Sequence, residues 1–341
     1  MLTNCWLTIN RSCNLRCTWC YAKNTNYLSK YNMDLGLAKE LVDICDQLKI
    51  KHITIIGGEP TIYPDLFEII EYINTKCMKC GIVTNGLAFE KEEFVDKLIN
   101  LGINNFSISL KGENREVFNK ITGFDKWKNV IAGIKNLIKK NCSVSISMVL
   151  TEDNIDTFIE GVKECYSLGV SHFRFSFCYE FNSNNNAANY SDPSIPKKMI
   201  KKFVEIYPKL NEACNGHFNL FQSYPLCLWD DEFIKILVKR NQVSSICQLL
   251  NTSGLLFDSN GHLIPCNAMY EIKMGQYGVD FNNGKELLEH LGTEDVKKVF
   301  KVLTGVPSTK CIECPKLKYC GGGCVCQWTN YTFEDLFLKE D

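Results

Sequence analysis

The sequence predicts an α/β fold, a partial (β/α)6 TIM barrel followed by a small cysteine-rich domain. As far as about residue 177, short apolar runs alternate with longer amphipathic segments, which is typical of strand–helix units around a parallel sheet. Cysteine then becomes frequent towards the end of the chain. We expect a barrel over residues 1–225, a linking helical segment over 226–242 and a cysteine-rich domain over 243–341.

Six strands and three helices are expected within the barrel. A helix over 38–48 has one apolar face and Asp34 as its N-cap. A second helix follows Asn154, and a third covers 196–214 after an asparagine-rich loop over 182–196. The expected strands are residues 5–10, 52–56, 81–84, 104–110, 143–149 and 170–177.

The last three of these strands separate polar from apolar side chains, because alternate residues face opposite sides of a sheet. A closed eight-stranded barrel fills its interior with branched apolar side chains. We therefore expect a wider, partly open barrel that holds a polar ligand. The polar set comprises Ser107, Ser109, Lys111, Ser143, Ser145, Ser147, His172, Arg174 and Ser176.

Composition argues against several classes of protein, and RNA-modifying chemistry is demoted rather than excluded. The 341 residues carry a net charge of −1, which lacks the basic footprint of a nucleic-acid-binding protein. No apolar stretch approaches the ~18 residues that span a bilayer, and the N-terminus has no secretory signal. The 19 cysteines then favour metal ligation over disulfides, in a reducing cytoplasm and away from membranes.

Three cysteines follow the first expected strand, with the spacing Cys13-x3-Cys17-x2-Cys20. Cysteine thiolates are the usual protein ligands of iron–sulfur clusters, and three of them leave one corner of a four-iron cube open. Zinc is the alternative, but zinc sites usually use paired cysteines or histidines, and no fourth ligand lies nearby. Because barrel enzymes place their chemistry at the carboxyl ends of strands, these cysteines are the expected catalytic residues.

This run resembles the cluster loop of the radical SAM superfamily, with Trp19 at the aromatic position that lies near adenine. The resemblance implies a [4Fe–4S] cluster whose free iron chelates S-adenosylmethionine (SAM). Reductive cleavage of SAM would give a 5′-deoxyadenosyl radical that abstracts a hydrogen atom. Gly57-Gly58-Glu59-Pro60 resembles the family element that binds the SAM amino group. By the same resemblance, Asn85 lines the cofactor and Ser109 contacts its ribose or carboxylate.

Two positions depart from the family pattern. Lys111 stands where many relatives have an acid, and Thr122 where many peptide-modifying members have an arginine. Arg174, on the polar face of the sixth strand, is the expected source of the missing charge. The resulting cofactor-binding set is Trp19, Gly57, Gly58, Glu59, Asn85, Ser109, Lys111 and Arg174.

The C-terminal cysteines form a second pattern, Cys247-x13-Gly261-x4-Cys266 followed by Cys311-x2-Cys314-x5-Cys320-x3-Cys324. It resembles the SPASM extension, which carries one or two auxiliary [4Fe–4S] clusters. The resemblance assigns Cys247, Cys266 and Cys324 to the first cluster and Cys311, Cys314 and Cys320 to the second. A zinc ribbon built from the last four cysteines is the alternative.

Both auxiliary sets are incomplete. The family's final distant cysteine is absent, which leaves Cys326 as a close substitute in the metal-binding set. Cys227 is a further candidate, either as a missing cluster ligand or as a hydrogen-atom donor. The alternative is that its side chain only packs against its neighbours. The remaining cysteines are expected to be bystanders or small buried hydrophobes; these are Cys45, Cys77, Cys80, Cys142 and Cys165.

The resemblance favours a maturase that acts on a ribosomally made peptide or a protein and forms a thioether or carbon–carbon crosslink by net oxidation. Peptide epimerisation, sulfatase maturation and small-molecule chemistry are alternatives, and a zinc-binding interaction protein is the non-enzymatic one. Sulfatase maturases commonly have an aspartate base where this chain has Asn267. One expected partner is an electron donor of the flavodoxin or ferredoxin type. Since only twelve residues precede Cys13, any leader-peptide recognition would need a separate leader-peptide-binding protein or another surface of this chain.

Overall fold

The computed structural model describes residues 2–22, 31–178, 192–221, 224–244 and 247–337. It forms two compact units, which are described separately. Unit 1 comprises Met1–Ser109, Lys128–Val144 and Gln248–Thr304, and unit 2 comprises Leu110–Trp127, Ser145–Cys247 and Gly305–Asp341. Each unit combines parts of the expected barrel and of the expected C-terminal domain, so the domain boundaries given above stay a prediction.

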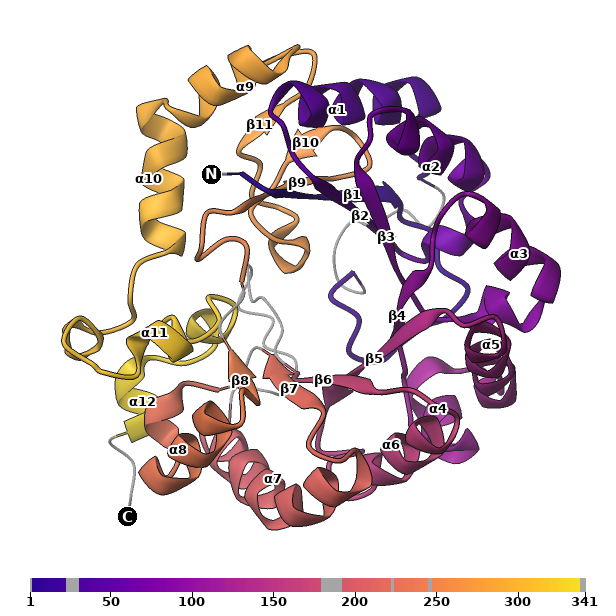
Figure 1. Cartoon of the computed structure of the whole chain (residues 1–341). Helices are drawn as coiled ribbons and strands as arrows, with labels where there is room; N and C mark the ends of the chain where they lie inside the picture. Colours follow the sequence, from indigo (N-terminus) through magenta and orange to yellow (C-terminus); the bar gives the residue numbers. More distant parts are fainter. Residues whose placement is uncertain (1, 23–30, 179–191, 222–223, 245–246, 338–341) are drawn as a thin grey trace. The chain divides into compact units, whose positions relative to one another are not determined.

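Unit 1 contains a sheet with the strand order β11-β10-β9-β1-β2-β3-β4 (Figure 1). β1 pairs in parallel with β2 on one side and with β9 on the other, while β10 pairs antiparallel with β9 and β11. The carboxyl ends of β1 to β4 therefore lie along one edge of the sheet. The strands are β1 (Asn4–Asn10), β2 (His52–Gly57), β3 (Lys79–Thr84), β4 (Asn105–Ser109), β9 (Gly254–Phe257), β10 (His262–Leu263) and β11 (Gly275–Gln276).

The α-helices of unit 1 bury one apolar face each. In α1 the buried positions include Ala38, Leu41, Val42 and Cys45, as the spacing of apolar residues predicts. Figure 1 shows α1, α2, α3 and α5 along one face of β1 to β4. The helices are α1 (Leu35–Gln47), α2 (Leu66–Thr75), α3 (Glu92–Asn100), α5 (Trp127–Lys139), α9 (Gly284–Leu291) and α10 (Glu294–Leu303), with the short η1 (Pro60–Ile62), η2 (Leu87–Glu90) and η4 (Asn267–Met269).

Unit 2 contains the parallel strands β5 to β8, packed on an aromatic core. The ring of Phe177 stacks on Tyr224 with centroids 4.6 Å apart, and Phe203 meets Trp229 edge-on at 5.8 Å. The strands are β5 (Ser143–Leu150), β6 (His172–Phe177), β7 (Phe218–Phe221) and β8 (Val243–Ser244). The helices are α4 (Arg115–Thr122), α6 (Phe158–Ser167), α7 (Ser194–Ala213), α8 (Asp231–Lys239), α11 (Leu317–Cys320) and α12 (Phe333–Phe337), with η3 (Leu226–Leu228), η5 (Thr309–Cys311) and η6 (Gln327–Thr329).

The six expected strands are present, and β4, β5 and β6 bury alternate residues as predicted. The helix after Asn154 begins later than expected, at Phe158. Its start is delayed because the Asn154 side chain accepts from Thr151 N at 2.8 Å and donates to Val149 O at 2.9 Å, which holds a turn. Most of the asparagine-rich loop lies outside the described residues.

Additional strands were not predicted. β7 and β8 have four and two residues, too short for a periodic signal. Among the helices of the described residues, none is long and apolar enough to cross a membrane.

The N-cap of α1 gives a stability test. The Asp34 carboxylate accepts a hydrogen bond from Leu37 N at 3.1 Å. We expect Asp34→Ala to lower the free energy of unfolding by about 1 kcal/mol, and Asp34→Asn, which retains an acceptor, to lower it much less. Urea unfolding followed by circular dichroism measures both. Equal losses in the two variants would contradict the cap.

Candidate functional site

The cysteines of the first run lie in the loop that follows β1. Cys17 is buried, and Cys13 and Cys20 are half-buried. Cys20 N donates to Cys17 O at 3.1 Å, and Leu15 N donates to Cys13 Sγ at 3.4 Å. The loop thus carries local backbone hydrogen bonds that fix the turn between the thiols and point a donor at one sulfur.

A glycine pair at the end of β2 packs directly against this loop. Gly58 N donates to Asn10 O at 3.0 Å, and Glu59 N donates to Ser12 O at 2.8 Å. A Cβ atom on Gly57 would lie 2.0 Å from Asn10 Oδ1, and one on Gly58 would lie 2.2 Å from Ser12 O. Because both distances are far below van der Waals contact, the approach requires glycine at both positions.

Glu59 joins the ends of β2 and β3 through a buried carboxylate. Its Oε1 accepts from Thr61 N at 3.1 Å and from the hydroxyls of Thr61 and Thr84 at 2.6 Å each. Its Oε2 accepts from Asn85 N at 2.7 Å. These hydrogen bonds offset the cost of burying the charge. The SAM contact expected of this element stays a prediction, since the observed partners of the carboxylate all belong to the protein.

Asn85 connects the end of β3 to the cysteine loop. Its Nδ2 donates to Asn14 Oδ1 at 2.7 Å, and its Oδ1 accepts from Leu87 N at 3.0 Å. Asn14 lies between the first two cysteines of the run. The structure therefore brings Asn85 to the cysteine loop. The half-buried Trp19 belongs to that loop, and the half-buried Ser109 ends β4 in the same unit.

Lys111 and Arg174 belong to unit 2, so their contact with a cofactor stays a prediction. Arg174 is exposed on β6, in register with Ser147 and Asn219. Thr122, at the position where relatives have an arginine, donates its hydroxyl to Phe118 O at 2.7 Å. The Thr122 hydroxyl thus forms a hydrogen bond to a backbone carbonyl of its own helix.

Unit 1 also contains a buried charge network that sequence reasoning missed. Asp258 accepts from Lys273 Nζ at 2.8 Å and pairs with Arg11 at 3.8 Å, and the Arg11 guanidinium lies 3.8 Å from the centroid of the Tyr270 ring. Burial lowers the pKa of Arg11 to about 10. Burial alone would raise the pKa of Asp258, but the hydrogen bond and charge of Lys273 hold it below its usual value. The sequence feature that could have indicated this network is Arg11 itself, a charged residue between an apolar strand and Cys13.

Asn267, directly after Cys266, is buried beside β1. Its Oδ1 accepts from the hydroxyl of Thr8 at 3.2 Å. The amide thus has a structural partner, and an amide cannot take up a proton as a carboxylate does.

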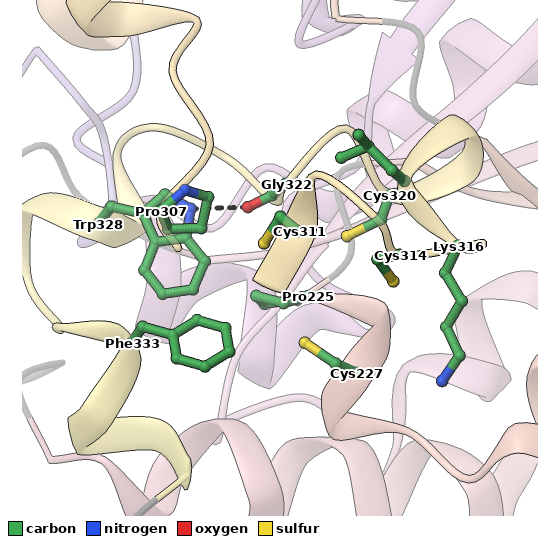
Figure 2. Close-up of a pocket in the computed structure, with 11 residues that line it drawn as sticks. Pro225, Cys227, Pro307, Cys311, Cys314, Lys316, Cys320, Gly322, Trp328 and Phe333 are labelled. Carbon is green, nitrogen blue, oxygen red and sulfur yellow. Dashed lines mark hydrogen bonds between the residues drawn. The ribbon is translucent and has the colours of Figure 1, made fainter. Parts of the chain in front are cut away.

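A second group of thiols lines one pocket in unit 2. Figure 2 shows Cys227, Cys311, Cys314 and Cys320 around the same space, with Lys316 at its edge. In the described part of the chain, no three cysteine, histidine or carboxylate side chains are close enough to share one metal ion. A cluster does not require such closeness, because each thiolate binds a different iron. A cluster site is therefore recognised by several thiols that surround a common space. The apolar part of the lining comprises Pro225, Pro307, Leu317, Trp328 and Phe333.

Cys324 and Cys326 form a separate pair in unit 2. A hydrogen bond from the Cys326 thiol lowers the pKa of Cys324. Cys247 is in unit 2 and Cys266 in unit 1, so the set expected for the first auxiliary cluster stays a prediction. Of the cysteines expected to be bystanders, Cys45, Cys142 and Cys165 are buried, Cys80 is half-buried and Cys77 is exposed.

Comparison with known proteins places these features in a family. The model of the radical SAM superfamily matches residues 7–165. A probable GTP 3′,8-cyclase of Pyrococcus horikoshii is 30% identical over 266 residues, which cover 78% of this chain and 83% of that protein. A probable GTP 3′,8-cyclase of Thermococcus kodakarensis is 29% identical over 149 residues, which cover 44% of this chain and 48% of that protein. The second match therefore spans about half of the relative.

Solved structures match almost the whole chain. SuiB of Streptococcus suis bound to precursor peptide SuiA has a TM-score of 0.70 at 20% identity, covering 97% of this chain and 75% of that one. Native anSMEcpe with bound AdoMet and Kp18Cys peptide has a TM-score of 0.70 at 18% identity, covering 95% and 89%. The predicted fold, a partial barrel with a cysteine-rich C-terminal region, is confirmed.

The contact at Gly58 gives the second prediction. We expect Gly58→Ala to displace the cysteine loop, because the new methyl group meets backbone oxygen atoms at 2.2 and 2.5 Å. Anaerobically reconstituted protein should lose the iron and sulfide of its first cluster. Gly81→Ala is the control, since its Cβ would meet only the tip of the His52 side chain, at 3.1 Å. Full iron content in Gly58→Ala would contradict the contact.

The buried carboxylate gives the third prediction. Glu59→Gln replaces one acceptor oxygen by an NH2 group that faces hydrogen-bond donors, so we expect a loss of about 1–3 kcal/mol in the free energy of unfolding. Glu68→Gln, at an exposed position on α2, should change it by less than about 0.5 kcal/mol. Chemical denaturation of the two variants measures the difference. Equal stability would show that the four hydrogen bonds contribute little.

Proposed function

Because the chain belongs to the radical SAM superfamily, we propose that this radical SAM enzyme acts on a peptide or protein and forms a thioether or carbon–carbon crosslink by net oxidation. The observation that carries this proposal is the thiol-lined pocket in unit 2. An auxiliary cluster held at such a site would accept the electron left on an oxidised substrate. The solved structures of SuiB and anSMEcpe support a peptide substrate, because both are described with a bound peptide.

The first site has the donor set that a cluster and SAM require. Cys13, Cys17 and Cys20 would hold three irons of a [4Fe–4S] cluster and leave the fourth for SAM. A cluster held there would supply the electron for reductive cleavage of SAM to methionine and a 5′-deoxyadenosyl radical. The chain's own contribution is position: the Gly57-Gly58 contact and the Asn85–Asn14 hydrogen bond hold the cysteine loop at the strand ends.

In unit 2, Cys311, Cys314 and Cys320 would hold an auxiliary [4Fe–4S] cluster, and the apolar lining would keep water from it. The polar faces of β5 and β6 offer hydroxyls and the Arg174 cation to a polar substrate. Peptide backbones present the donors and acceptors that such groups recognise.

A second candidate function is the cyclisation of GTP or of a related nucleotide. The 30% identity with the probable GTP 3′,8-cyclase of Pyrococcus horikoshii favours it. A nucleotide substrate requires cations that bind its phosphates, and Arg174 is one exposed candidate.

Peptide epimerisation and sulfatase maturation have less support. Epimerisation would use the same radical step but leave the peptide mass unchanged in water. A function in sulfatase maturation is disfavoured by the Asn267 amide, which is bound to Thr8. The zinc-binding interaction protein is set aside, because the chain is an enzyme of this superfamily. A flavodoxin- or ferredoxin-type donor would supply electrons, and a separate protein or another surface of this chain would bind any leader peptide.

The fourth prediction separates these functions. Anaerobically reconstituted enzyme with SAM and dithionite should release 5′-deoxyadenosine. With the correct precursor from neighbouring small reading frames, the peptide should lose the mass of a pair of hydrogen atoms. Cys13→Ala should abolish both. Deuterium uptake from heavy water without that loss would instead indicate epimerisation, and conversion of GTP with all peptides unchanged would favour the cyclase function.

A further inference from the structure

The three cysteines Cys311, Cys314 and Cys320 do not complete a four-iron cluster. A cubane has four corners, so one iron needs a ligand from elsewhere. The residues that line the pocket, all in the described part of the chain, include Cys227 but neither Cys324 nor Cys326. Cys326, the candidate from the sequence, is 2% exposed.

Cys227 is held beside these cysteines by its neighbours. It lies in η3, between β7 and α8, and is exposed. The backbone N–H of Leu226 donates to Cys320 Sγ at 3.4 Å. Lys316 donates to Leu226 O at 3.4 Å and pairs with Asp231 at the start of α8. Three contacts therefore hold the segment that carries Cys227 against the segment that carries Cys314 and Cys320.

The surroundings of Cys320 suit a cluster-bound thiolate. The backbone N–H of Leu226 donates to its sulfur at 3.4 Å, and Gly323 N donates to Cys320 O at 3.0 Å, which holds the turn after this cysteine. Gly321, Gly322 and Gly323 have φ angles of 62°, 84° and 85°, so the chain turns through the left-handed region that favours glycine. Hydrogen bonds from backbone N–H to sulfur are a feature of iron–sulfur sites, where they stabilise the reduced cluster.

The lining of the pocket also fits. Pro225 and Trp328 pack against Gly323, where a Cβ would lie 3.2 Å from the proline ring and 3.4 Å from the indole. Trp328 Nε1 donates to Gly322 O at 2.8 Å, as Figure 2 shows. These contacts fix the glycine turn next to Cys320 and limit solvent access on that side.

We propose that Cys227 is the fourth ligand of the cluster held by Cys311, Cys314 and Cys320. This inference rests on the auxiliary cluster of the proposed function. The ligand comes from the connection between β7 and α8, upstream of the C-terminal cysteine pattern, and it leaves that cluster with no open iron. Cys326 then has no part in this cluster.

The test uses a background in which Cys13, Cys17 and Cys20 are replaced by alanine, so that only auxiliary clusters remain. Cys227→Ala should lose iron on mild oxidation and show the electron paramagnetic resonance signal of a [3Fe–4S] cluster, because an iron without a protein thiolate dissociates. Cys326→Ala and the surface control Cys77→Ala should keep the iron content and the spectrum of the background. An unchanged spectrum in Cys227→Ala would overturn the proposal.

Thiol alkylation of the unmodified chain provides a second readout that does not depend on the folding of a variant. With iron fully loaded, iodoacetamide should modify the exposed Cys77 but not Cys227. After removal of iron with a chelator and ferricyanide, Cys227 should become reactive. Equal modification of Cys77 and Cys227 in the loaded protein would overturn the assignment.

The auxiliary cluster itself has its own control. Replacement of Cys311, Cys314 and Cys320 together in the same background should remove one cluster's iron and sulfide. If that variant keeps all of its iron, the auxiliary cluster of the proposed function fails. If it loses the iron while Cys227→Ala does not, only the assignment of Cys227 fails.

Discussion

The close approach of the β2 terminus to the cysteine loop is the constraint on which the first site depends. Two glycines allow backbone atoms of residues 10–12 to lie where side chains would otherwise be. Buried hydrogen bonds then hold the geometry, through the Glu59 carboxylate on one side and Asn85 on the other. A flexible loop with three thiols would lose conformational entropy each time it bound a cluster, and these contacts remove much of that cost in advance.

Much of the fold could be predicted from local patterns. Alternating residues identified the faces of β4, β5 and β6, and apolar spacing with Asp34 identified α1. The short strands could not be found in this way, since four residues or fewer carry no periodicity. The delayed start of α6 depends on side-chain hydrogen bonds of Asn154, which compete with the helix and which propensity alone does not reveal.

The site was predictable where residues lie close together in sequence and not where they are far apart. The spacing of Cys13, Cys17 and Cys20 marked the first site. The buried network pairs Arg11 with Asp258 and Tyr270, which lie near the other end of the chain, and no local pattern predicts such a pairing. For Cys227, the sequence left a ligand, a hydrogen-atom donor and simple packing all open, and its placement beside three other thiols required the fold.

The link between η3 and the C-terminal segment also bears on how the polypeptide reaches its final state. Leu226 and Cys320 are 94 positions apart. An iron–sulfur cluster that links these two segments would restrict the denatured chain as a disulfide does. For a loop of about 100 residues, the corresponding contribution to the free energy of unfolding is about 4–5 kcal/mol. Under iron scarcity such a protein would be depleted through unfolding and proteolysis, rather than accumulate as an intact but inert species.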